Sequence, residues 1–283
     1  MTTPDRTDTD TDGGADSDSG DDGVRRFLGL QATNDPARWV LPVTDGICGG
    51  RGALYGGCGL AAVIEAAEGS VGRPTAWGTL QFASGARPPA QLTLDVEVLA
   101  GGRRMSQVRV SGHADGELVM AALLALGRRE QVAEGYWERM PAVPSPADCP
   151  SRKLVNEERR GGLRSRIDER TATTGPDGLL TAEGGRSALW VTMTGGVPAS
   201  ASALALLGDD VSAGVAAAVG DDVRARSIDN TIRVVQPRST PWVLADVQVH
   251  AVVDGLGHGS VNLWSEDGHL LAVTGQTGLV GPR

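Results

Sequence analysis

Polar side chains interrupt two apolar strands that are predicted near the C-terminus, and they are the first candidates for chemistry. Ser227 and Asp229 stand at the start of one strand, and Gln276 lies inside the apolar run 270–280. A sheet core does not need such groups, because a buried polar side chain costs free energy unless it finds a partner. The chain has no Gly-x-Ser-x-Gly elbow, which argues against a serine nucleophile of the hydrolase type.

The elements that must position these groups form a predicted antiparallel meander over 227–280. Apolar residues alternate from Val243 to Val249, the period of two that places one face of a strand on a core. Asp267-Gly268 separates two further apolar runs, and such a dipeptide favours a tight hairpin turn because it accepts positive φ at low cost. The sequence therefore predicts strands joined by short turns.

A similar set of elements is predicted upstream. The strong helix formers at 60–68 are apolar on nearly every side, which indicates a buried helix that stops near Gly69. A second helical region at 199–219 is interrupted at Gly208-Asp209-Asp210. Strands are predicted at 77–82, 92–99, 103–110, 118–126, 189–192, 227–235, 242–253, 259–264 and 270–280.

The two sets of elements are related by an internal duplication. A shift of 151 residues places the alternating pattern that begins at Leu92 on the one that begins at Val243, and a shift of 152 places Asp115-Gly116 on Asp267-Gly268. A residue needed only for folding should have a similar partner in both halves. Three positions break this rule, since Asp209, Ser227 and Gln276 lie opposite Cys58, Ala76 and Leu124.

Composition and charge divide the chain into four parts and argue against nucleic-acid binding. The sequence predicts a disordered acidic tail at 1–24, one repeat at 25–130, a linker at 131–169 and a second repeat at 170–283. Eight Asp against one Arg in residues 1–23 carry −7 of the net charge of −9, so the remainder is nearly neutral. Such a surface does not favour nucleic acid as a partner.

Cysteine usage and hydropathy indicate a soluble cytoplasmic protein. The three cysteines are an odd number without CxxC spacing, which argues against a disulfide framework and a zinc site. No metal and no cofactor are therefore predicted. The N-terminus does not resemble a secretory signal, and no apolar run is expected to reach the roughly 20 residues of a membrane span.

Three motifs resemble the acyl-CoA thioesterase II family. They are Tyr55-Gly56-Gly57 before the first helix, Ser227-Ile228-Asp229-Asn230 at a strand start, and Asp267-Gly268 leading to Gln276-Thr277-Gly278. The resemblance extends from about residue 25 to the end. It implies an α+β tandem double hot-dog fold, in which a long buried helix is wrapped by an antiparallel sheet in each repeat.

The same resemblance implies hydrolysis of acyl-CoA thioesters in fatty acid metabolism. Asp209, Ser227 and Gln276 occupy the positions of a catalytic group that binds and activates water, and these residue types can accept its proton and hold its other atoms. Backbone N–H groups at a helix start could hold the oxyanion. The expected substrate-binding residues are Gly56, Gly57, Cys58 and Asp229. A homodimer or higher homo-oligomer is expected, because broad sheet faces are usually covered by another copy.

Other interpretations of these residues stay open at this stage. Asp209 or Asp210 could cap a helix that begins near Val211, with Asp210 as the alternative catalytic carboxylate if the register slips by one. Gln276 could be a structural amide, and Asp229 could pair with Arg233 or Arg238.

Two further alternatives concern Cys58 and the function itself. The Cys58 thiol could have a lowered pKa beside a helix start, although a buried inert thiol is favoured. The functional alternatives are a non-catalytic acyl-CoA binding protein and a hot-dog hydratase or dehydratase, which would pair Asp with His. His250 and His258 are expected to be exposed or structural.

Overall fold

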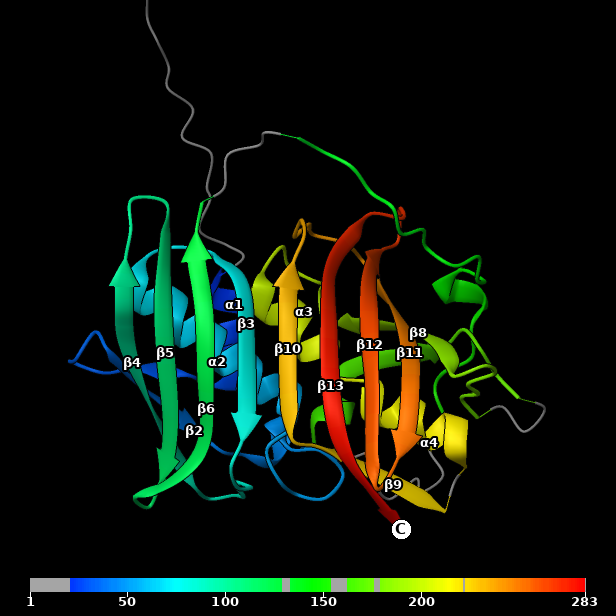
Figure 1. Ribbon diagram of the computed structural model, residues 1–283, viewed down its shortest axis with the longest axis horizontal. Coiled ribbons are helices and arrows are strands. Elements are labelled where there is room, and N and C mark those ends of the chain that lie inside the picture. The colour runs from blue at the N-terminus through cyan, green and yellow to red at the C-terminus, as the bar shows by residue number, and fades with distance from the viewer. Residues whose placement is uncertain (1–20, 129–132, 154–161, 176–178, 221, 283) are drawn as a thin grey trace, which may run out of the picture.

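The computed structural model describes residues 21–128, 133–153, 162–175, 179–220 and 222–282 (Figure 1). Residues 1–20 of the predicted tail, and residues 131–132 and 154–161 of the predicted linker, lie outside the described residues. The tail ends earlier than predicted, because helix α1 begins at Asp21 and Val24 within it is fully buried. The linker also ends earlier, since strand β7 begins at Ile167.

The described chain contains more strand than helix. The helices are α1 (Asp21–Leu28), α2 (Gly56–Val71), α3 (Ala201–Leu207) and α4 (Val211–Val219), with the 3-10 turns η1 (Asp45–Ile47), η2 (Pro146–Asp148) and η4 (Gly162–Ser165). The strands are β1 (Gln31–Ala32), β2 (Arg38–Pro42), β3 (Thr75–Phe82), β4 (Gln91–Gly101), β5 (Met105–Ala114), β6 (Glu117–Gly127), β7 (Ile167–Thr171), β8 (Arg186–Met193), β9 (Val223–Ser227), β10 (Asp229–Val234), β11 (Val243–Val253), β12 (Leu256–Ser265) and β13 (Leu270–Pro282).

These strands form one antiparallel sheet that crosses the whole molecule, with the helices against one of its faces (Figure 1). The order is β1-β2-β4-β5-β6-β3-β10-β13-β12-β11-β8-β7, and β9 pairs with β13. The two halves meet edge to edge where β3 pairs with β10, and Thr79 lies opposite Thr231. These two residues are separated by 152 positions, the duplication shift, so the joint lies on a pseudo-twofold axis. This pairing leaves neither half with an open edge at the centre of the sheet.

The duplication is visible in the strand register as well as in the sequence. The β4–β5 pairing shifts between Val98 and Ala100, and the β11–β12 pairing shifts between Val249 and Ala251. Each position in the second half lies 151 residues after its partner in the first. Both halves therefore carry the same β-bulge, a feature that bends a strand locally.

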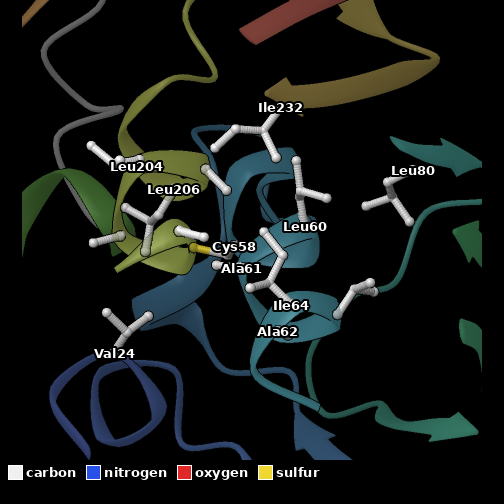
Figure 2. Packing of buried hydrophobic residues seen from close by; sticks show 14 of the residues in the cluster. Val24, Cys58, Leu60, Ala61, Ala62, Ile64, Leu80, Leu204, Leu206 and Ile232 are labelled. Carbon is white, nitrogen blue, oxygen red and sulfur yellow. The ribbon is translucent and has the colours of Figure 1, made fainter. Parts of the chain in front are cut away.

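Helix α2 is the central helix of the first half and is buried along most of its length. It continues past the predicted stop at Gly69, where a Cβ would lie 2.5 Å from a ring carbon of Trp39, so glycine is needed there for close packing. The helix ends at Gly72, which adopts the left-handed conformation with φ of 68°. Figure 2 shows that Cys58 and Ala61 of α2 face Leu204 and Leu206 of α3.

The second half has two short helices in place of one long helix. The break lies at Gly208, where a Cβ would stand 2.6 Å from Cγ2 of Thr274, and Thr274 Oγ1 donates to the Gly208 carbonyl at 2.8 Å. By length and composition the stretch Ala201–Val219 would suffice to cross a membrane, contrary to the expectation from sequence, but 67% of its most apolar window is buried inside the protein. A buried core helix meets the same criterion.

Candidate active site

A cavity of about 560 Å³ opens where the two halves meet. The start of α2, the end of β3, the loops around them, β9 and one face of α4 contribute to its wall. Among its lining residues are Tyr55, Gly56 and Phe82 from the first half and Asp209, Ser212 and Ser227 from the second. Two of the three residues that break the duplication therefore lie in the wall of one cavity.

Asp209 stands in the link between α3 and α4 with 7% of its surface exposed. Its Oδ2 accepts the Gly57 N–H at 2.6 Å, and its Oδ1 accepts the Gln276 Nε2–H. The Tyr55 hydroxyl donates to the Asp209 backbone carbonyl. The carboxylate from the second repeat is thus held at the N-terminus of the central helix of the first repeat, where the helix dipole favours negative charge.

The Tyr-Gly-Gly motif owes its glycines to this close approach. A Cβ on Gly56 would lie 2.6 Å from Asp209 Oδ2, and a Cβ on Gly57 would lie 2.5 Å from the Leu206 carbonyl oxygen. Any side chain at either position would push the second repeat away from α2. The motif is therefore a packing requirement of the site.

Gln276 lies on β13 behind the cavity wall and is 5% exposed. Its Oε1 accepts the Val211 N–H at 3.0 Å, so the amide caps the first turn of α4 and its orientation is fixed. Its Nε2 donates to Asp209 and, at 3.1 Å, to Ser227 Oγ. Capping by Asp209 or Asp210 was an open alternative, but Asp210 occupies the N-cap position without a side-chain cap hydrogen bond.

Ser227 ends β9, where the predicted strand 227–235 breaks into β9 and β10. Its Oγ lies 3.1 Å from the Ser212 hydroxyl of α4 as well as from Gln276. The strand register supports the match between Gln276 and Leu124. Gln276 pairs with Gly259, and Leu124 pairs with Val108. Val108 and Gly259 are themselves separated by the duplication shift of 151 residues. The structure thus places Asp209, Ser227 and Gln276 in one hydrogen-bonded group.

Burial shifts Asp209 toward its protonated form, against the effect of its hydrogen bonds and of the helix N-terminus. The pKa of Asp209 is raised to about 7, mainly by burial and also by the nearby charge of Asp210. The Gln276 and Gly57 hydrogen bonds and the Arg164 guanidinium oppose this rise. A carboxyl whose pKa lies near neutrality can both accept and return a proton at physiological pH.

Two of the residues expected to bind substrate have other places in the structure. Cys58 is fully buried in the core and burial strongly raises the pKa of its thiol, so it is an inert thiol and does not line the cavity. Asp229 Oδ1 accepts the Thr277 N–H at 2.5 Å and ties β10 to β13. Within the described residues Asp229 forms no ion pair with Arg233 or Arg238. Gly56 lines the cavity, and Gly57 binds Asp209.

The histidines lie elsewhere, because none is among the described residues that line the cavity. His250 lies 3.0 Å from Ser260, and His258 lies 3.2 Å from Thr277, both at exposed positions. The described residues therefore do not place a histidine beside Asp209 in the cavity wall, where the Asp-His pair of a hot-dog hydratase would be expected.

Sequence reasoning missed a buried ionic cluster beside Asp209, formed by Arg152, Arg164, Glu169 and Asp210. Three of these residues fall in the segment predicted to be a linker. Its charged, aperiodic composition is typical of exposed chain, and no sequence signal showed that these charges compensate one another inside the protein.

Two family models match most of the chain. Residues 44–127 match the acyl-CoA thioesterase N-terminal domain, and residues 146–280 match the acyl-CoA thioesterase C-terminal domain. The chain belongs to the acyl-CoA thioesterase family. The family predicted from the motifs is confirmed, and as an acyl-CoA thioesterase the protein is an enzyme of thioester hydrolysis.

Solved structures resemble this acyl-CoA thioesterase over nearly its whole length. A protein classed as a thioesterase from Novosphingobium aromaticivorans DSM 12444 is 31% identical, with a TM-score of 0.78 over 89% of this chain and 98% of that chain. A hot-dog protein of unknown function from Alicyclobacillus acidocaldarius is 20% identical, with a TM-score of 0.80 over 92% and 98%.

An acyl-CoA thioesterase II from Mycobacterium marinum is 17% identical, with a TM-score of 0.73 over 92% of this chain and 98% of that chain. At these lower identities the likeness shows the hot-dog fold alone. No curated protein matches the chain.

Proposed function

We propose that the protein hydrolyses acyl-CoA to a free acid and CoA with a water molecule activated by Asp209. The observation that carries this proposal is the position of Asp209 in the cavity wall, where the carboxylate is bound by Gln276 and by the first turn of α2. Release of free thiol from a panel of acyl-CoA substrates tests it. Intact substrate after incubation with the folded protein would contradict it.

The proposed reaction has two steps. Asp209 takes one proton from water while the water oxygen bonds to the thioester carbon and the carbonyl oxygen becomes an oxyanion. The oxyanion then collapses, the C–S bond breaks, and the proton on Asp209 goes to the departing thiolate. Ser227 Oγ lines the same wall and can hold the water by a hydrogen bond.

Gln276 has a different role in this proposal from the one expected from sequence. Because it stands behind the wall, it fixes Asp209 and Ser227 and does not hold the water itself. The Gly56 N–H at the start of α2 is the proposed oxyanion donor, since helix N-termini stabilise developing negative charge.

The two halves of the sheet, each with its own helices, suggest a more specific fold. We propose a tandem double hot-dog, in which α2 is the central helix of the first repeat and α3 with α4 form that of the second. The shared β-bulges and the pseudo-twofold joint support this assignment.

Cationic side chains at the cavity suit the phosphates of CoA. Five exposed basic residues are among its lining residues: Arg51, Arg87, Lys153, Arg224 and Arg226. Arginine binds phosphate through paired N–H groups. The proposed orientation therefore directs the nucleotide end of CoA toward these residues and the thioester toward Asp209.

The double variant Arg51→Gln/Arg87→Gln is expected to lower kcat/KM for an acyl-CoA by roughly tenfold or more, because charge-assisted hydrogen bonds to phosphate are lost. The same variant should hydrolyse the matching acyl-N-acetylcysteamine thioester at the wild-type rate, since that substrate has no phosphate. Arg109→Gln on the exposed face of β5 serves as the matched control. Equal losses on both substrates would contradict phosphate binding at this rim.

The oligomeric state and location also belong to the proposal. We expect a cytoplasmic homo-oligomer, and exposed apolar side chains such as Leu99, Leu118 and Leu123 on strands β4 and β6 support contact with another copy. Light scattering at micromolar concentration is expected to give at least twice the mass of 29.2 kDa. A monomer mass would contradict self-association.

A further inference from the structure

Asp210, the residue that follows Asp209, belongs to a compact cluster of two acidic and two basic side chains. Arg152 Nη1 lies 2.9 Å from Glu169 Oε1 and 3.3 Å from Asp210 Oδ1, and Arg164 pairs with Glu169 Oε2. The side chains of Arg152, Asp210 and Glu169 are at most 10% exposed. The pKa of Asp210 is raised, mainly by burial and also by the Glu169 carboxylate, whereas the Arg152 and Arg164 guanidiniums oppose this rise by favouring the charged form.

Few charged groups surround Asp209 besides this cluster. The ionisable groups that act on it are Tyr55 and Cys58 from the first half, Arg164 of η4, and Asp210. Burial raises the pKa of both Tyr55 and Cys58, so these two stay neutral at physiological pH. Gln276, Ser227 and the Gly57 N–H contribute only neutral hydrogen-bonding groups. Among the described residues, Asp210 is therefore a negative charge that acts on Asp209, and Arg164 is a positive one.

The fold itself does not require a charge at position 210. The duplication shift of 151 places Gly59 of α2 at the equivalent position, and that half of the molecule is buried there without a carboxylate. Replacing a buried ion cluster by apolar groups is often neutral or stabilising, so such a cluster is weak evidence of a purely structural role. Arg152, Arg164 and Glu169 of the cluster line the same cavity as Asp209 and Ser227.

We propose that Asp210 is a positioning residue that acts through Asp209: Arg152 keeps it charged, and this fixed negative charge beside Asp209 strengthens Asp209 as a proton acceptor. The proposal rests on the proposed function, in which Asp209 takes the proton of water. A like charge makes a neighbouring carboxylate hold its proton more tightly. Arg152 supplies the compensation that allows two adjacent carboxylates to be buried together.

The pH dependence of kcat/KM for an acyl-CoA tests this role. In Asp210→Asn the acidic limb of the profile is expected to move to lower pH by on the order of one unit, because Asp209 would lose its proton more readily. Asp210→Gly, which copies the first repeat, should move the limb in the same direction. Asp210→Glu conserves the charge and should leave the limb near that of the wild type.

Asp168→Asn provides a matched control, because Asp168 lies on β7 next to Glu169, is half exposed, and pairs with Arg170 outside the cluster. The titration of the Asp209 carboxyl carbon, followed by NMR in the wild type and in Asp210→Asn, gives a readout that does not require activity. A titration midpoint and an acidic limb that stay unchanged in both Asp210→Asn and Asp210→Gly would overturn the inference. An inactive wild type with a shifted Asp209 titration would instead contradict the proposed function and leave this coupling supported.

Discussion

Gln276→Ala is expected to lower kcat by about a hundredfold, a loss of roughly 2.7 kcal/mol of transition-state stabilisation. The amide holds Asp209 Oδ1, Ser227 Oγ and the first N–H of α4 at the same time. Without it, the base and the hydroxyl lose their common support, whereas the cavity that binds substrate keeps its wall. KM should therefore change much less than kcat.

A double variant separates this role from simple loss of structure. Asp209→Asn alone should cost at least as much as Gln276→Ala, and the combined variant should cost much less than the sum, because both changes disable one proton acceptor. The melting temperature is measured on the same preparations, with Gln248→Ala on the exposed face of β11 as the control. Near-normal turnover in folded Gln276→Ala protein would remove this site from consideration.

Asp209 should also make the stability of the wild type fall as pH rises from acidic to neutral. Burial raises the pKa of Asp209 to about 7 in the folded chain, whereas an unfolded aspartate titrates near about 3.9. Between these two values the unfolded state has released the proton that the folded state still binds. The free energy of unfolding contributed by this group therefore decreases with pH over that window.

Asp209→Asn does not titrate, so its free energy of unfolding should rise relative to the wild type by roughly 3 to 4 kcal/mol between about pH 4 and pH 8. The variant loses one hydrogen bond at every pH. This loss lowers its free energy of unfolding by the same amount throughout and does not change how that free energy depends on pH. Urea unfolding at several pH values measures the difference, with Asp168→Asn as the exposed control. A difference that stays constant with pH would show that Asp209 is already ionised in the folded chain under acidic conditions.

Local sequence signals were sufficient for most of the fold because they act over short distances. Alternating apolar residues and the Asp-Gly turns placed the strands, and Asp115 and Gly116 do adopt positive φ of 51° and 82°. The end of α2 was wrong because the fit of Gly69 against Trp39 is a tertiary contact. The split of the strand at Ile228 depends likewise on how two segments pair with β13.

For the candidate site, asymmetry between the repeats was the useful signal. It selected Asp209, Ser227 and Gln276, which the fold brings into direct contact. The asymmetry could not show which of the three side chains line the cavity, since Asp209 and Ser227 do and Gln276 lies behind them. The buried inert thiol favoured for Cys58 is confirmed, but its expected place in the substrate site is not, because α3 covers this helix start.

The pseudo-twofold joint between β3 and β10 has a consequence for stoichiometry. A twofold axis through two identical subunits would create two equivalent pockets, whereas here the positions opposite the site carry Cys58, Ala76 and Leu124. Each chain should therefore bind one acyl-CoA, at a place to which one repeat gives the carboxylate and the other the N–H group that holds it. Because the two repeats are joined in one chain and differ in sequence, neither repeat needs a surface that is complementary to a copy of itself. A mutation in either half now alters only one side of one pocket, so the two walls can adapt to the acyl group and to CoA independently.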